Sequence, residues 1–177
     1  SLGPAHPNVS APLIGLATVL VQQHKYNDAE LFVRRALSID EASFGPEHPN
    51  VAEDLVALAK VLREQGRYSE AEPALQRALA IDVKMLPRDS FEAANDHNEL
   101  ALLAQAQKDW SRAAAHWQLA VEILQRRLAR ASRLDSRLSN RREPEVNKHY
   151  FDNLIKATYR LQSASPATHF APATMTK

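Results

Sequence analysis

The chain has 177 residues, 45% of them apolar, which is enough for one well-buried domain and short for two. Lysine and arginine (22) nearly balance aspartate and glutamate (21), so no overall charge draws the chain toward nucleic acid or anionic membrane. Cysteine is absent, which excludes disulfides, thiolate metal sites and thiol catalysis.

No apolar run approaches the roughly 20 residues that a membrane-spanning helix needs. The first residues, SLGP, lack the basic and apolar regions of a signal peptide. We therefore expect a soluble chain. The absence of cysteine fits both a reducing cytosol and an oxidising periplasm, so the compartment stays open, with the cytoplasm favoured.

The sequence repeats itself with a period of 42 residues, since GPAHPNV at 3–9 returns as GPEHPNV at 45–51. A fixed offset of this length indicates an array of structural repeats. The first two copies also share Leu16-Ala17 with Leu58-Ala59, Tyr26 with Tyr68, Ala29-Glu30 with Ala71-Glu72, and Ala36-Leu37 with Ala78-Leu79. A third, more diverged copy keeps Leu100, Ala101, Trp110, Ala113, Ala120 and Ile123.

Each copy predicts two amphipathic helices joined by a tight turn. In the first copy apolar residues follow helical spacing at Leu13, Leu16, Ala17 and Leu20, and again at Ala29, Phe32, Val33, Ala36 and Leu37. The turns fall at 23–28 and 65–70, where Gly66 can end one helix and Asn27 or Ser69 can cap the next. The recurring alanines indicate that helices approach each other closely.

These motifs resemble the tetratricopeptide repeat, in the 42-residue variety of kinesin light chain. The resemblance rests on FGPEHPNV at 44–51 and QGRYSEAE at 65–72, followed by Ala78-Leu79, and it covers residues 2–127. It implies an all-α solenoid of three units, at about 2–43, 44–85 and 86–127. His24 and Lys108 replace Gly66, and the third copy lacks the Gly-Pro and His-Pro pairs.

After the third unit the chain becomes rich in arginine. Between 126 and 142 apolar residues keep helical spacing, so we expect the last repeat helix to continue with a basic outer face. Its arginines are Arg126, Arg127, Arg130, Arg133, Arg137, Arg141 and Arg142. A capping helix is predicted at about 145–162, with Phe151, Leu154, Ile155, Thr158 and Leu161 on its apolar side. These parts complete a single domain, 1–162, and the Ala/Pro/Thr/Ser tail at 163–177 should be disordered.

The chain opens inside an inter-repeat loop, so we expect another repeat to precede it in a longer array. An uncovered first helix would then expose apolar surface. Self-association through that end is the resulting hypothesis.

Signs of catalysis are missing, so we expect no enzyme activity, cofactor, metal or small-molecule substrate. The histidines contain no pair at metal-ligand spacing, and His6 and His48 are repeat equivalents with a structural role. Trp110 and Trp117 occupy packing positions of the repeat. Glu30, Glu72 and Asp82 are expected on a solvated face or in ion pairs.

The resemblance places function in the concave groove, which the first helix of each unit lines. It implies a protein or peptide partner bound there. The polar groove residues are Thr18 and Gln22, then Lys60, Arg63 and Glu64, then Asn98, Glu99 and Gln105. Their mixed charge does not match the carboxylate clamp of chaperone-binding relatives.

Asn98 lies in HNELA at 97–101, similar to the NNLA stretch with which kinesin light chain repeats hold a peptide backbone. Its amide could pair with any peptide unit. The alternative is an ordinary solvated helix position, since Ile14 and Val56 are its repeat equivalents.

Two functions remain open from the sequence. The first is an interaction scaffold that binds a partner segment in the groove. The second is docking through the arginine-rich helix to an acidic protein, an anionic lipid or nucleic acid, which predicts steep salt dependence. For the arginines a solvated helix face is the simpler interpretation.

Overall fold

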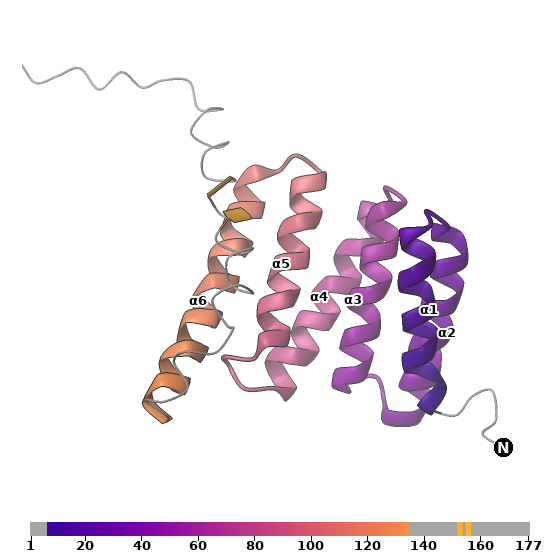
Figure 1. Ribbon diagram of the computed structural model, residues 1–177, viewed down its shortest axis with the longest axis horizontal. Helices are drawn as coiled ribbons and strands as arrows, with labels where there is room; N and C mark the ends of the chain where they lie inside the picture. Colours follow the sequence, from indigo (N-terminus) through magenta and orange to yellow (C-terminus); the bar gives the residue numbers. More distant parts are fainter. Residues whose placement is uncertain (1–6, 135–151, 154, 157–177) are drawn as a thin grey trace, which may run out of the picture.

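The computed structural model describes residues 7–134, 152, 153, 155 and 156. All the regular secondary structure of these residues is helical, as the sequence predicts. A short 3-10 helix, Pro7–Val9, precedes α1 (Ser10–Gln22), α2 (Tyr26–Phe44), α3 (Pro49–Glu64), α4 (Tyr68–Met85), α5 (Phe91–Ala106) and α6 (Trp110–Leu134). Consecutive helices pair into hairpins, and the three hairpins stack in chain order from right to left in Figure 1.

Small side chains let the helices of this array approach one another. Three alanine positions recur in every repeat, and all nine side chains are at most 2% exposed. They are Ala17, Ala59 and Ala101 in the first helices, with Ala29, Ala71, Ala113, Ala36, Ala78 and Ala120 in the second helices. A larger side chain at these positions would push the helix backbones apart.

The turn inside each hairpin has the same backbone conformation in all three units. His24, Gly66 and Lys108 occupy equivalent positions and have φ values of 59°, 76° and 63°. This left-handed conformation is common where helices end, and glycine adopts it without steric strain. The first and third turns therefore keep the glycine geometry without the glycine.

Side chains at repeat-equivalent positions also begin the helices. His48 Nδ1 accepts a hydrogen bond from the Asn50 N–H at 3.2 Å, directly before Pro49. The corresponding Ser90 accepts one from the Ala93 N–H at 3.1 Å. Because the imidazole also stacks on Phe44, with ring centroids 4.7 Å apart, His48 has the structural role expected of it.

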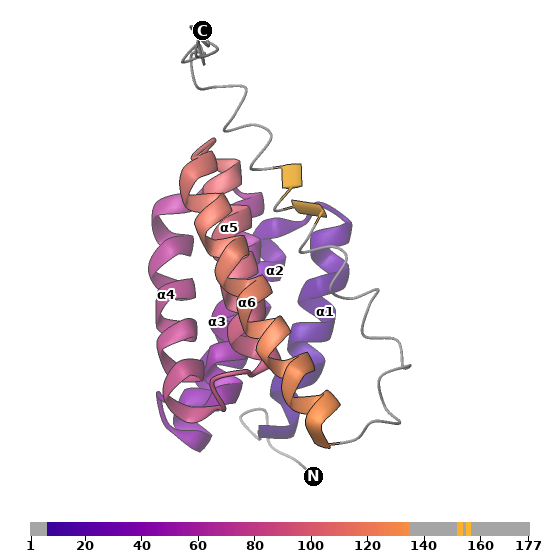
Figure 2. The ribbon, with the colours of Figure 1, turned by 90° about the vertical axis from the view of Figure 1, so that its left-hand side faces the viewer.

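Beyond the third unit the described chain covers only part of the predicted elements. Helix α6 runs past Arg127 to Leu134 and lies at the left-hand edge of the array, in front of α5 in Figure 2. The rest of the basic stretch to 142, most of the capping segment 145–162 and the tail 163–177 lie outside the described residues. Within the capping segment Asn153 is buried, whereas Ile155 is 63% exposed, contrary to its predicted place on the packed side.

Candidate functional site

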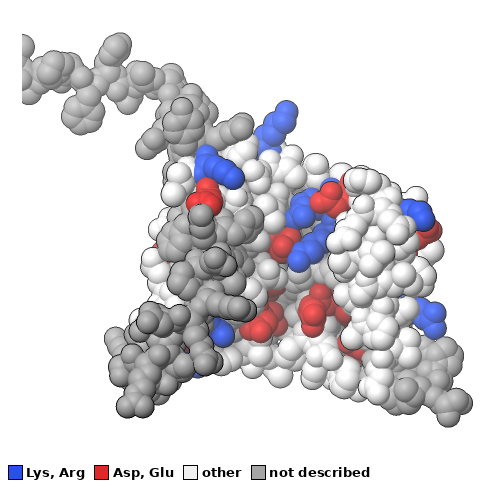
Figure 3. All heavy atoms as spheres, viewed as in Figure 1, with Lys and Arg blue, Asp and Glu red and all other residues white. Residues whose placement is uncertain are grey.

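A hollow of about 560 Å³ lies between the first helices of the three hairpins. Figure 3 shows it as a depression in the middle of one face, where basic and acidic side chains gather. It lies between the helices that the resemblance expects to line a concave groove. Its lining residues are Ile14, Ala17, Thr18 and Val21 of α1, Val33 of α2, Pro49, Asn50, Glu53, Val56, Ala57, Lys60 and Val61 of α3, Asp82 of α4, Leu86, and Phe91, Glu92, Asn95 and Asp96 of α5.

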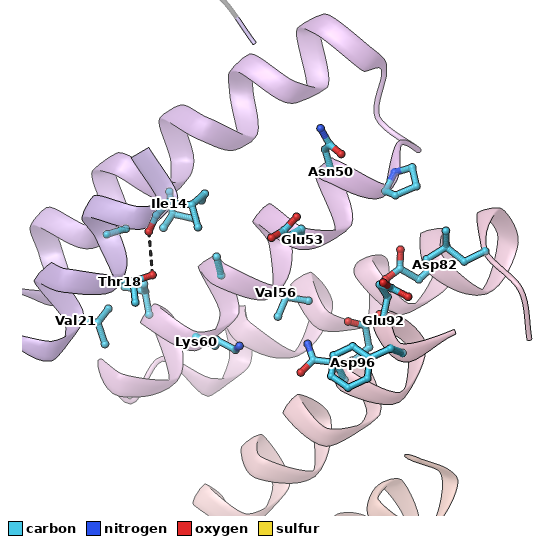
Figure 4. Close-up of a pocket in the computed structure, with 18 residues that line it drawn as sticks. Ile14, Thr18, Val21, Asn50, Glu53, Val56, Lys60, Asp82, Glu92 and Asp96 are labelled. Atoms are coloured by element: carbon cyan, nitrogen blue, oxygen red, sulfur yellow. Dashed lines mark hydrogen bonds between the residues drawn. The ribbon is translucent and has the colours of Figure 1, made fainter. Parts of the chain in front are cut away.

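One part of the hollow is apolar. Ile14 and Val21 of α1 face Val56 of α3 across it (Figure 4). The Thr18 hydroxyl donates to the Ile14 carbonyl oxygen at 3.0 Å, so this polar group is satisfied within its own helix. The surface can therefore accept aliphatic side chains without leaving a donor unpaired.

The other part of the hollow carries four acids (Figure 4). Glu53 of α3 and Glu92 of α5 are exposed, and we call them the rim acids. Asp82 of α4 and Asp96 of α5 are only 4% and 1% exposed, and we call them the floor acids. The expectation that Asp82 lies on a solvated face or in an ion pair was wrong, because this position packs at the junction between two hairpins.

The floor acids interact with each other, and both have raised pKa values. Burial, the charge of Asp82 and a hydrogen bond with Asp82 raise the pKa of Asp96 to about 8. Burial is also the largest influence on Asp82, whose pKa rises to about 6. One oxygen on each, Asp82 Oδ1 and Asp96 Oδ2, is buried without a hydrogen-bond partner.

The neighbouring junction carries an equivalent pair. Asp40 and Asp54, each 3% exposed, precede Asp82 and Asp96 by one repeat. Burial and the nearby Asp40 raise the pKa of Asp54 to about 7. Inward-facing carboxyl groups are therefore a repeated feature of the junctions between hairpins.

Four predicted groove residues form an ion cluster at the edge of the hollow. Glu99, whose side chain is 7% exposed, accepts from Arg63 Nη1 at 2.8 Å and lies 3.3 Å from Lys60 Nζ. Arg63 also lies 3.3 Å from Glu64. The two cations are thus engaged within the protein, and Lys60, which is 44% exposed, is the member that lines the hollow.

Asn98 is buried between α5 and α6, with 5% of its surface exposed. Its Oδ1 accepts a hydrogen bond at 3.0 Å from Nε1 of Trp117, which is completely buried. Neither proposed environment, the ligand-facing amide or the solvated position, describes this arrangement. Of the remaining predicted groove residues, only Thr18 and Lys60 line the hollow, and Gln22, Arg63, Glu64, Glu99 and Gln105 do not.

The described arginines of the basic stretch are exposed at the far end of α6. Arg130 forms an ion pair with Asp89 at 2.9 Å, and Arg126 lies 3.7 Å from Glu122. Arg127 is exposed. The side chain of Arg133 lies outside the described part of the structure, as do Arg137, Arg141 and Arg142.

A histidine pair was not anticipated. The Nδ1 atoms of His97 and His116 are 3.2 Å apart between α5 and α6, and burial lowers the pKa of His97 to about 4. Among the described residues no group of three His, Asp or Glu could hold a metal ion. None of the described helices combines the length and the apolar character that crossing a membrane requires.

Comparison with known proteins identifies the repeats. Residues 10–82 match the tetratricopeptide repeat family. No curated protein matches the sequence significantly. The resemblance to kinesin-light-chain repeats is confirmed by structures that share this fold.

BtubC (BKLC) from P. vanneervenii has a TM-score of 0.68 at 18% identity, over 97% of this chain and 72% of that one. Two structures of a Podosopora anserina protein assigned as a kinesin light chain, with nearly identical TPR-like repeats, are also similar. One of them, a form with a single substitution, gives 0.67 at 21% identity, over 90% of this chain and 71% of that one. The other gives 0.63 at 20%, over 93% and 80%. At these identities the similarity concerns the fold.

Proposed function

We propose that this tetratricopeptide repeat chain is a protein-interaction module that holds a segment of another protein in the hollow between α1, α3 and α5. Such repeats generally mediate protein–protein interactions and are typically non-catalytic scaffolds. The observation that carries the proposal is the hollow itself, about 560 Å³ in volume and lined by the first helix of each hairpin. Clefts with apolar walls and a few polar groups are the usual form of a binding site.

Capture of partners from an extract of the source organism tests the proposal. Thr18→Trp fills the hollow from an exposed position, and Gln76→Trp adds the same side chain on the exposed side of α4. We expect a partner that wild type and Gln76→Trp retain and Thr18→Trp loses. Retention of every partner by Thr18→Trp would contradict groove binding.

The arginine-rich end of α6 is the competing surface, because Arg126, Arg127 and Arg130 are all exposed there. Its ion pairs with Glu122 and Asp89 reduce the charge it offers to a partner. The variant that carries glutamate at these three positions separates the two functions. Loss of the partner by this variant alone, with a complex that dissociates in moderate salt, would assign docking to the basic surface.

A further inference from the structure

We infer that the segment held in the hollow carries a lysine or arginine next to aliphatic side chains. The inference rests on the proposed groove function and names the chemistry of its partner. The cation would lie between the rim acids, and its aliphatic neighbours would lie on the apolar part of the hollow.

The charge of the hollow supports a cationic partner. Its charged lining residues are Glu53, Asp82, Glu92 and Asp96 against Lys60 alone, and Lys60 already lies 3.3 Å from Glu99. Even with one proton shared by the floor acids, the lining keeps a net negative charge. Because low-dielectric walls focus such a field, this part of the hollow attracts a positive group.

The burial of the floor acids strengthens this charge argument. Burying a carboxylate is unfavourable, and the hydrogen bond between Asp82 and Asp96 joins two groups of like charge. No cation among the lining residues reaches this pair: Lys60 pairs with Glu99, and the contacts that raise the pKa of Asp96 are with Asp82, Glu92 and Glu99. A cation bound at the rim would offset this like-charge repulsion.

The apolar part of the hollow sets the rest of the partner. Ile14, Val21, Val56 and Ala57 line it, and the nearby Thr18 hydroxyl is satisfied by its own helix. Aliphatic side chains seated there would be removed from water, whereas a purely polar basic segment would leave the surface unused. The occupant that fits both parts is therefore an amphipathic basic segment of another protein.

Selection from a random dodecapeptide library displayed on phage tests the inference without choosing a ligand beforehand. Peptides are selected on the wild-type chain and counter-selected on Thr18→Trp, so that only groove-dependent peptides remain. We expect Lys or Arg beside aliphatic residues in these peptides. Synthetic copies are then measured by fluorescence anisotropy.

The matched variants differ in where the charge is removed. Glu53→Gln/Glu92→Gln neutralises the rim acids, and Glu70→Gln/Glu122→Gln neutralises two acids outside the hollow. The rim variant should weaken binding about tenfold, as expected for losing a charge-assisted contact, and the control variant should bind as wild type does. Asp82→Asn/Asp96→Asn should weaken it less, because the floor acids act through their field.

The outcomes separate the inference from the function on which it rests. Groove-dependent peptides that are acidic or uncharged, or that bind the rim variant as tightly as wild type, would overturn the cationic partner and leave groove binding intact. If no selected peptide depends on the Thr18 position, both proposals fail.

Discussion

At the scale of single residues, the interior of the third repeat uses a polar pair where the other repeats are apolar. Asn98 and Trp117 replace Val56 and Leu75 of the second unit, and their side chains hydrogen-bond at 3.0 Å. The indole brings an N–H into the core, and the amide supplies its acceptor. The two changes belong together, since a buried donor without a partner is costly.

Asn98→Val should therefore lower the free energy of unfolding by about 1–3 kcal/mol, the range for a buried donor left unpaired. Urea denaturation followed by tryptophan fluorescence measures this, because Trp117 reports directly on its own surroundings. Gln118→Val on the exposed side of α6 is the control and should have little effect. Unchanged stability together with loss of a groove peptide would instead restore the ligand-contact role of Asn98.

The hairpin turns give a second prediction at this scale. Lys108 adopts φ 63° at the position that Gly66 occupies with φ 76°, and a non-glycine residue is strained there. Lys108→Gly should raise the free energy of unfolding by up to about 1 kcal/mol, and Gly66→Ala should lower it by about 1 kcal/mol. His24 is a less direct choice, because its ring also bonds the Tyr26 hydroxyl at 2.7 Å. A destabilised Lys108→Gly protein would contradict this account of the turn.

At the scale of helices, the sequence predicts best the features that recur with the 42-residue period. The buried alanines and the turn positions recur every 42 residues, so one pattern located all of them. The ion pairs between hairpins are harder to predict, because the charges at equivalent positions differ between repeats. Arg67 reaches Glu30 at 2.7 Å and pairs with Glu70, whereas Asp109 and Arg112 reverse these charges.

Arg112 nevertheless reaches Glu72, the repeat equivalent of Glu30, at 2.7 Å. The arginine that binds this glutamate therefore occupies a different position of the turn in the two repeats. A comparison of residue types at equivalent positions does not detect it. Glu30 and Glu72 were expected on a solvated face or in ion pairs, and both form ion pairs, but the choice of partner required the structure.

The floor acids recur with the repeat period, but their burial was not predicted. A carboxylate on a helix is ordinarily assigned to solvent, because burial of an unpaired charge is unfavourable. Asp40 and Asp82, together with Asp54 and Asp96, recur at the 42-residue offset, and that recurrence was the available signal. Their burial depends on packing between hairpins, which periodicity within one helix does not describe.

These buried carboxyl groups predict how the stability of the helix junctions depends on pH. The pKa values of Asp54 and Asp96 rise to about 7 and 8, so the folded state keeps protons that the unfolded state releases near pH 4. Their contribution is fully present in acid and is lost as the pH rises toward 8. The pKa of His97 is lowered to about 4. This residue therefore lowers the free energy of unfolding only below pH 6.5, where the unfolded imidazole takes up a proton.

Between pH 6.5 and 8.5 the free energy of unfolding should therefore fall, and Asp54→Asn/Asp96→Asn should make it nearly constant. Asparagine keeps the shape and cannot ionise, so the variant should be more stable than wild type at pH 8.5, by an amount on the order of 1 kcal/mol per group. Urea titrations at several pH values measure this. A variant with the same slope as wild type would show that other groups set the dependence.

At the scale of the whole molecule, the stack of hairpins has two unlike ends. Helix α6 extends beyond its hairpin at one end, whereas α1 and α2 form the other end (Figure 1). On α1, Leu16 and Val19 are 44% and 47% exposed, and Leu31 of α2 is 69% exposed. Repeat arrays are stable because each hairpin covers its neighbour, so apolar side chains at an end hairpin favour contact with another hairpin.

In the isolated chain that contact can come from a second copy. We expect light scattering to give a mass that rises above the 19.8 kDa of one chain as the concentration increases. Val19→Lys should shift this association to higher concentration, because a charge there would have to be buried, whereas Gln76→Lys on α4 should leave it unchanged. A mass equal to one chain at every concentration would show that the α1–α2 end is stable when exposed to water, and that any covering partner is not this chain.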